Sequence, residues 1–160
     1  MAKAEKTNVM RLLDAAKITY KEFTYDPETV DGLSVVKSIG EDPEAVFKTL
    51  VTENEDKEHF VFCVPVCAEL DLKKAAKAAK SKSIAMIHQK ELLPLTGYVH
   101  GGCSPIGMKK AFPTFIDETA QLFDQIYVSG GKRGFQVCLS PSDLCGYVKA
   151  EFADLTKALN

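Results

Sequence analysis

The chain has 160 residues, of which 46% are apolar and 26% charged, an ordinary composition for a folded protein, and we expect one domain over residues 1–160. Its formal net charge of −2 argues against a protein that coats nucleic acid regardless of sequence, because such proteins are basic. The first residues lack the apolar core of a secretion signal, so we expect a cytoplasmic protein. The longest apolar run (60–68) is too short to cross a bilayer, so we expect no membrane association. The five cysteines are then expected to be free thiols.

The first part of the chain alternates helical and extended patterns. Helices are expected over 5–17, 33–39 and 71–80, and strands over 18–25, 46–53, 59–66 and 83–87. Gly40 suits the left-handed position that follows a helix, and Asp71 is placed to cap the helix after it. Asp42 and Pro43 predict a short helical turn before the second strand.

The second part mixes strands with short helices. A helix is expected to start at 88 and to be ended by Pro94 and Gly97. Strands are expected over 114–118, 125–129 and 135–139, followed by helices that begin at Ser140 and at about 151, the last running to 159. Because helices and strands are interspersed and several strand pairs are hairpin-linked, we predict a mixed α/β or α+β fold with a partly antiparallel sheet.

A glycine-rich segment, 96–110, combines potential catalytic groups with backbone freedom. His100 and Cys103 could act as a base and a nucleophile. On an extended segment their spacing tends to place the two side chains on opposite faces, so we interpret both residues as bystanders. The cysteines form no CxxC pair that a second pair matches, and we expect neither a metal nor another cofactor.

Lys48 is the anomaly of the predicted strand 46–53. Val46, Lys48 and Leu50 share one face of this strand, and the other face is apolar as well. A strand that is apolar on both faces is expected to be covered on both faces, so the lysine must reach water, pair, or line a cavity. It is either a cation at an edge strand or a binding group in a pocket.

Two basic segments each allow two interpretations. The turn at 129–134 precedes a strand and lacks the spacing of a nucleotide-binding P-loop. It is either a tight hairpin or a backbone cradle that holds a phosphate or carboxylate with Lys132 and Arg133. Lys73 and Lys77 share a helical face, which is either a solvated surface or a contact for a nucleic-acid backbone.

Four segments occur together in the order and spacing of one family: "VFKTLV" with Lys48, "ELDLKKAAKA", "TGYVHGGCSPIGMKK" with Gly101 and Pro105, and "IYVSGGKRGFQV". From about Tyr20 to Leu155 the chain resembles the YbaK/EbsC family, free-standing relatives of the editing domain inserted in bacterial prolyl-tRNA synthetases. The resemblance implies an α+β fold whose mixed, largely antiparallel, barrel-like sheet is flanked by helices. It also implies a pocket for the 3′ CCA end of an aminoacyl-tRNA.

The resemblance and the motifs above together nominate the site. Lys48 corresponds to the functional lysine of the family. The expected substrate-binding positions are Tyr25, Asp31, Thr49, Gly101, Gly102, Pro105, Ser129, Gly130 and Gly131, and the expected nucleic-acid contacts are Lys132, Arg133, Lys73 and Lys77. Asp31 and Gln136 stand where the cysteine-specific branch has an aromatic residue and an acid, so the amino acid that is cleared stays open.

The family resemblance implies a trans-acting deacylase that clears cysteine from tRNA for proline. In that branch the thiol of the substrate attacks its own carbonyl and displaces the tRNA, so the protein supplies no nucleophile. Lys48 would then stabilise negative charge, the glycine loop would act through its backbone, and prolyl-tRNA synthetase would be a docking partner. The alternative is a non-catalytic module that binds an aminoacyl-nucleotide or a tRNA 3′ end for regulation.

Overall fold

The computed structural model describes residues 6–29 and 31–157. Its helices are α1 (Asn8–Ala15), α2 (Gly32–Ile39), α3 (Leu72–Ala78), α4 (Gln89–Thr96), the 3₁₀ helix η1 (Glu118–Leu122) and α5 (Pro141–Val148). Its strands are β1 (Tyr20–Thr24), β2 (Phe47–Asn54), β3 (His59–Pro65), β4 (Ile84–Met86), β5 (Thr114–Asp117), β6 (Ile126–Ser129), β7 (Phe135–Leu139) and β8 (Glu151–Ala153). No helix within these residues has both the length and the apolar character that a membrane span requires.

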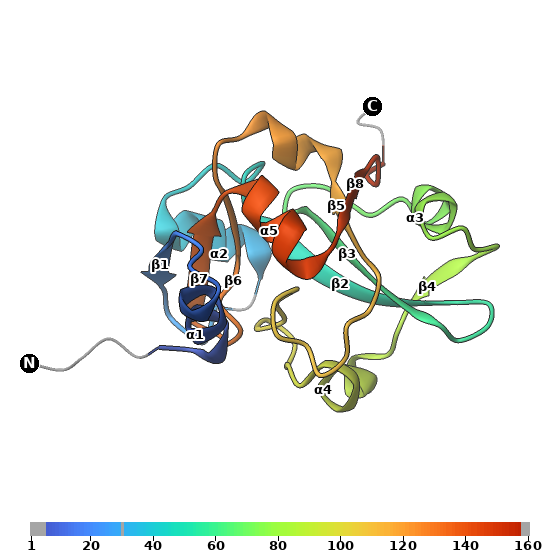
Figure 1. Cartoon of the computed structure of the whole chain (residues 1–160), viewed down its shortest axis with the longest axis horizontal. Coiled ribbons are helices and arrows are strands. Elements are labelled where there is room, and N and C mark those ends of the chain that lie inside the picture. The colour runs from blue at the N-terminus through green and yellow to red at the C-terminus, as the bar shows by residue number, and fades with distance from the viewer. Residues whose placement is uncertain (1–5, 30, 158–160) are drawn as a thin grey trace, which may run out of the picture.

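The strands form two sheets, which lie beside each other in Figure 1. The smaller sheet has the order β1-β7-β6 and is antiparallel throughout. The larger sheet has the order β4-β2-β3-β5-β8, with β5 and β8 added in parallel to an antiparallel hairpin. The mixed, largely antiparallel α/β fold is therefore confirmed, but the strands do not close into one barrel.

The two sheets meet at the start of β2. Val46 forms an isolated parallel bridge with Tyr127 of β6, and the Tyr127 N–H donates to the Ala45 carbonyl at 2.9 Å. No further ladder joins β2 to β6 within the described residues. The bridge therefore fixes one end of β2 against the small sheet and leaves the next residues of both strands free to line a space between the sheets.

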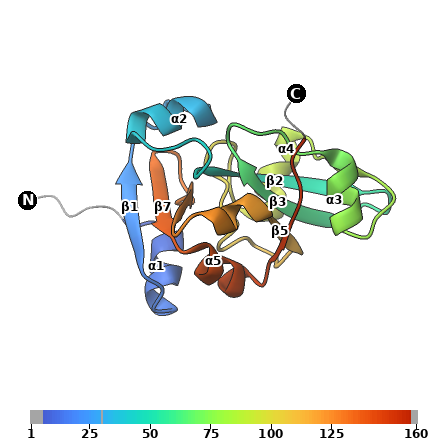
Figure 2. The ribbon, with the colours of Figure 1, turned by 90° about the horizontal axis from the view of Figure 1, so that it is seen from above.

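The large sheet is covered on both faces. Phe60, Phe62 and Val64 of β3 pack under α3, whereas Cys63, which points the opposite way, joins the core shared with the small sheet. That second core also holds α1 and α5, and Figure 2 shows α1 near the lower end of β1 and α2 near its upper end. The expectation from the apolar pattern of residues 46–53, a strand covered on both faces, is thereby met.

Local signals placed several helix ends correctly. Asp71 accepts hydrogen bonds from the N–H groups of Lys73 and Lys74 at the start of α3, and Ser140 accepts one from Asp143 at the start of α5. The termination at Pro94 was wrong, because α4 continues through it to Thr96 and ends at the left-handed Gly97. The segment at Asp42 forms a single turn, as predicted, which is closed by the Ala45 N–H donating to the Asp42 carbonyl at 2.9 Å.

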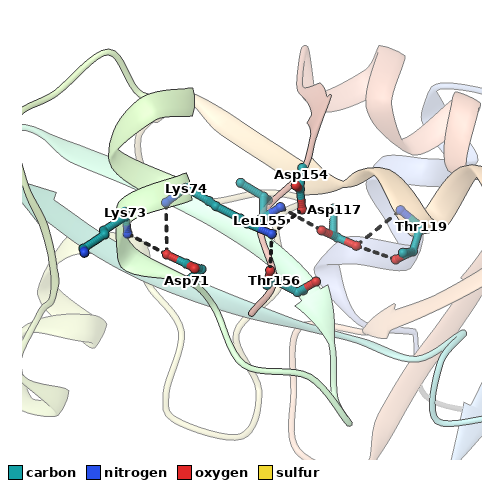
Figure 3. Close-up of polar contacts among 8 residues, drawn as sticks. All are labelled: Asp71, Lys73, Lys74, Asp117, Thr119, Asp154, Leu155 and Thr156. Carbon is teal, nitrogen blue, oxygen red and sulfur yellow. Dashed lines mark hydrogen bonds and ion pairs between the residues drawn. The ribbon is translucent and has the colours of Figure 1, made fainter. Parts of the chain in front are cut away.

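The helix expected over 151–159 is wrong in the described part of that range. Residues 151–153 form β8, which pairs in parallel with β5, and residues 158–159 lie outside the description. The buried carboxylate of Asp117 accepts the Leu155 N–H at 2.9 Å, and Lys74 donates to the Thr156 carbonyl at 2.7 Å (Figure 3). These partners come from elsewhere in the chain, and together they hold the segment extended.

Candidate functional site

A cavity of about 410 Å³ opens where the two sheets separate. Its wall comes from both sheets, from the start of α2, from α4 and from the glycine-rich loop. The lining residues are Tyr25, Asp31, Gly32, Val35, Val46, Phe47, Lys48, Thr49, Leu50, Val66, Leu92, His100, Gly101, Cys103, Ser129 and Gln136. The structure thus brings together six predicted site residues: Lys48, Thr49, Tyr25, Asp31, Gly101 and Ser129.

Lys48 contributes the ammonium group of the cavity. It lies two residues beyond the Val46 bridge, is half-buried, and pairs in the ladder with Val64 of the central strand β3. Its ammonium forms no hydrogen bond or ion pair with any residue in the described part of the chain. A cation with apolar strand neighbours and no protein partner is suited to hold an anionic or polar ligand group.

The glycine-rich loop is held against the β6–β7 turn. The Arg133 guanidinium donates from Nε to the His100 carbonyl at 2.7 Å. A Cβ at Gly102 would lie 3.0 Å from the Arg133 backbone nitrogen, so only glycine lets the two segments approach this closely. The contact fixes the loop backbone on the side of the cavity that Gly101 lines.

Ser129 and Gln136 form a polar wall on the small sheet. They are directly paired across β6 and β7, so their side chains lie on the same face. The Ser129 hydroxyl accepts the Gly131 N–H at 3.1 Å, which fixes the turn. Gln136 is buried, and its Oε1 has no hydrogen-bond partner in the described structure. The sequence analysis noted Gln136 only as a departure from the family pattern. A hairpin through the 129–134 turn pairs Gln136 with Ser129 and turns Val137 to the other face, and this pairing was the signal that could have placed Gln136 in the cavity.

Asp31 and Tyr25 border the cavity near α2. The Asp31 carboxylate accepts hydrogen bonds from the Ser34 N–H at 3.2 Å and the Ser34 hydroxyl at 2.9 Å, and it caps the helix. The acid at this position therefore has a structural role besides any contact with a ligand. Tyr25 is held by its N–H, which donates to the Gly134 carbonyl at 2.9 Å.

The thiols near the cavity are not prepared for nucleophilic attack. Burial raises the pKa of Cys103, in the glycine-rich loop, and of Cys63, in β3, to about 12 each. At pH 7 fewer than about one in 10⁴ of such thiols is ionised, and the thiolate is the reactive form. Residues 6–29 and 31–157 contain no group of three or more His, Cys, Asp or Glu side chains that could hold a metal.

Other predicted positions lie outside the lining. Pro105, Gly130 and Gly131 are supporting residues, as is Gly102. A Cβ at Gly131, which has φ +90°, would lie 2.6 Å from Cγ2 of Val9, so this glycine allows the turn to pack on α1. The Gly130 N–H donates to the Phe135 carbonyl at 2.9 Å and the Gly131 N–H donates to the Ser129 hydroxyl, so both N–H groups have partners within the protein.

The four predicted nucleic-acid contacts divide into two groups. Lys132 and Arg133 are exposed on the turn beside the glycine-rich loop. Lys73 and Lys77 are exposed on α3, which lies on the opposite side of the molecule from α2 (Figures 1 and 2) and contributes no residue to the cavity lining. Of the two groups, the first lies beside the loop that lines the cavity.

The cavity lies within a recognisable domain. A family model described as an aminoacyl-tRNA editing domain matches residues 26–146, well over half of the chain. The chain belongs to the aminoacyl-tRNA editing domain family. It is also 44% identical, over 95% of its own length and 94% of the relative's, to EbsC of Enterococcus faecalis, which is named as a proposed Cys-tRNA(Pro)/Cys-tRNA(Cys) deacylase.

Two solved structures share the fold of this editing-domain protein. One is described as a proposed trans-editing enzyme for prolyl-tRNA synthetase; it superposes with a TM-score of 0.81 over 97% of this chain and 100% of its own, at 22% identity. Another, a hypothetical protein, reaches a TM-score of 0.86 over 93% of this chain and 99% of its own, at 19% identity. At these identities the likeness establishes the fold alone.

Proposed function

We propose that this editing-domain protein is a trans-acting aminoacyl-tRNA deacylase that clears cysteine from tRNA for proline. One observation carries the proposal: in a chain of this family, Lys48, Gly101 and the Ser129–Gln136 wall line a common cavity. The name of the Enterococcus faecalis relative supports the choice of cysteine. The cavity volume of about 410 Å³ falls in the range of roughly 300–1,000 Å³ that is usual for small-molecule sites, enough for an aminoacyl group and part of its nucleotide.

The reaction requires positioning and charge stabilisation rather than a protein nucleophile. An aminoacyl ester is already activated, and the Cys103 thiol that lines the cavity is protonated at neutral pH, as is the buried Cys63. In the proposed step the sulfur of the substrate cysteine forms a bond to its own carbonyl carbon, and the bond from that carbon to the ribose oxygen breaks. The thiol proton ends on the ribose oxygen of the released tRNA, and the amino acid leaves as a cyclic thioester.

The protein would contribute Lys48 and the backbone of the glycine-rich loop. Negative charge develops on the carbonyl oxygen and then on the departing ribose oxygen, and an ammonium placed beside them stabilises both. Gly101 has no side chain and φ +88°, so its backbone can approach the ligand closely. His100 and Cys103 would line the site without reacting.

Affinity for the whole tRNA is proposed to come largely from docking on prolyl-tRNA synthetase. Tight binding of nucleic acid depends on many phosphate contacts, and this chain has a net charge of −2. Lys132 and Arg133 beside the cavity would add a few contacts. We expect the synthetase to raise the deacylation rate when the concentration of the editing protein is low; equal rates with and without it would contradict the docking.

Lys48→Ala tests the catalytic group. In single-turnover assays with Cys-tRNA(Pro), we expect the variant to lose at least about 10²-fold in rate, the usual effect of removing one group that stabilises a transition-state charge. Lys21→Ala, which removes an exposed lysine of β1, is the matched control and should keep the wild-type rate. A folded Lys48→Ala protein with the wild-type rate would remove Lys48 from the mechanism.

The substrate series tests both the amino acid and the role of its thiol. We expect release from Cys-tRNA(Pro) and no comparable release from Pro-, Ala- or Ser-charged tRNA, because only cysteine carries the attacking thiol. The rate should rise as pH approaches 8.5, where that thiol ionises. Equal release of serine would contradict the thiol mechanism and favour hydrolysis, and the absence of release from all four would contradict a deacylase.

A further inference from the structure

We infer that Gln136 recognises the α-amino group of the bound aminoacyl ester by accepting a hydrogen bond from it through Oε1. The inference rests on the proposed function and adds the group of the substrate that this side of the cavity reads. It makes Gln136 a specificity-determining residue for substrates whose α-amine is free, as opposed to N-acylated or peptidyl esters.

The burial of Gln136 is the first argument. Only 7% of the residue is exposed, yet Oε1 has no hydrogen-bond partner within the described structure. Buried polar atoms are nearly always satisfied, because leaving one unpaired costs free energy that folding must offset elsewhere. Since the side chain also lines the cavity, the missing partner is expected to be a donor on the ligand.

The chemistry of an aminoacyl ester selects the amine as that donor. Its ammonium carries three N–H groups and is the strongest donor of the ester, and hydrogen bonds that involve a charged group are the strongest. The ammonium of Lys48 comes from the other sheet and repels a second cation, so the amine is directed toward the Ser129–Gln136 wall. On that wall, the Ser129 hydroxyl already accepts the Gly131 N–H, and Gln136 Oε1 is the buried acceptor without a partner in the described structure. The carboxylate of the lining, Asp31, is exposed and already accepts two hydrogen bonds from Ser34 at the start of α2.

A neutral acceptor suits the proposed chemistry. An amide oxygen accepts from both the protonated and the neutral amine, whereas a carboxylate binds the protonated amine much better. Free α-amines titrate near pH 8, close to the pKa of about 8.5 of a cysteine thiol. Gln136 therefore holds the amine across the pH range in which the substrate thiol becomes reactive, and it adds no negative charge that would repel the attacking thiolate.

A pair of stable nucleoside analogues tests the inference. The first is 3′-amino-3′-deoxyadenosine joined by an amide to cysteine, and the second carries 3-mercaptopropionate, which lacks only the α-amine. Their dissociation constants are measured by calorimetry for the wild type, Gln136→Met, and the control Gln121→Met, an exposed glutamine of η1. Methionine keeps the volume and removes the acceptor.

We expect removal of the amine to weaken binding to the wild type and to Gln121→Met by about tenfold or more. Gln136→Met should bind both compounds equally, at the level of the amine-free compound. It should also melt no lower than the wild type, because an unpaired buried amide has been replaced by an apolar group. A purely structural role for Gln136 would instead lower the melting temperature.

Two results would overturn the inference. If Gln136→Met still distinguishes the compounds as the wild type does, Gln136 does not read the amine, and the deacylase proposal is unaffected. If the wild type binds neither compound at millimolar concentration, the inference fails, whereas the deacylase proposal is decided separately by the single-turnover assay with Cys-tRNA(Pro). If Gln136→Met does not fold, Gln136→Glu provides the test. This variant should bind the cysteinyl compound more tightly at pH 6 than at pH 9, and the ratio of the two affinities should exceed that of the wild type. An equal or smaller ratio would contradict the inference.

Discussion

Asp117→Ala should strongly destabilise the C-terminal part of the fold. The carboxylate is 1% exposed and accepts hydrogen bonds from the Leu155 N–H, at 2.9 Å, and from both the N–H and the hydroxyl of Thr119 (Figure 3). A hydrogen bond to a charged group contributes about 1.5–3 kcal/mol, and the N–H of the fully buried Leu155 would lose its partner. Because Thr119 can reach water more easily than Leu155, we expect a loss of about 3–5 kcal/mol rather than the sum of three bonds.

Urea denaturation followed by circular dichroism measures this loss. The matched control is Asp154→Ala, which removes an exposed carboxylate from the same segment; its ion pair with Lys74 should contribute less than about 1 kcal/mol. If Asp117→Ala costs no more than Asp154→Ala, the buried carboxylate does not hold the segment after β8, and the reason given for its extended conformation is wrong.

Three further outcomes follow from contacts around the site. Gly102→Ala should destabilise the folded protein by about 1–3 kcal/mol and slow deacylation, because the new Cβ would lie 3.0 Å from the Arg133 backbone nitrogen. The control Gly146→Ala adds a Cβ with nothing within 4 Å and should be neutral or stabilising. Equal urea midpoints for the two variants would contradict the close packing at Gly102. Cys103→Ser should keep most of the deacylation rate, and a complete loss would restore a protein nucleophile. Since burial raises the pKa of Cys103 and Cys63 to about 12, while unfolded thiols ionise near 8.5, the folded protein retains these protons and its stability should fall as pH rises between about 8.5 and 12. In the Cys63→Ala/Cys103→Ala variant this fall should be smaller by up to about 1.4 kcal/mol per thiol for each pH unit in that window, and an unchanged slope would show that other groups cause it.

Short-range patterns predicted most elements because their causes are local. The Asp71 and Ser140 caps and the left-handed Gly40 depend on a few consecutive residues, so the printed sequence contains the whole signal. Residues 151–157 show the limit: their pattern allows a helix, and pairing with β5 and the Asp117 carboxylate selects an extended chain. A partner that lies 38 residues away leaves no periodic trace in the segment itself.

The sequence by itself determined the chemical types at the site: a lysine in an apolar strand, a glycine-rich loop, and a turn that only glycines can make. The tertiary structure alone decided which of these groups share a cavity. The Val46–Tyr127 bridge joins two sheets whose next residues then separate, and this separation places Lys48 in one cavity with Ser129 and Gln136. Contacts between residues some 80 positions apart depend on how the two sheets pack. The packing energy comes from the whole core, so neither segment alone determines these contacts.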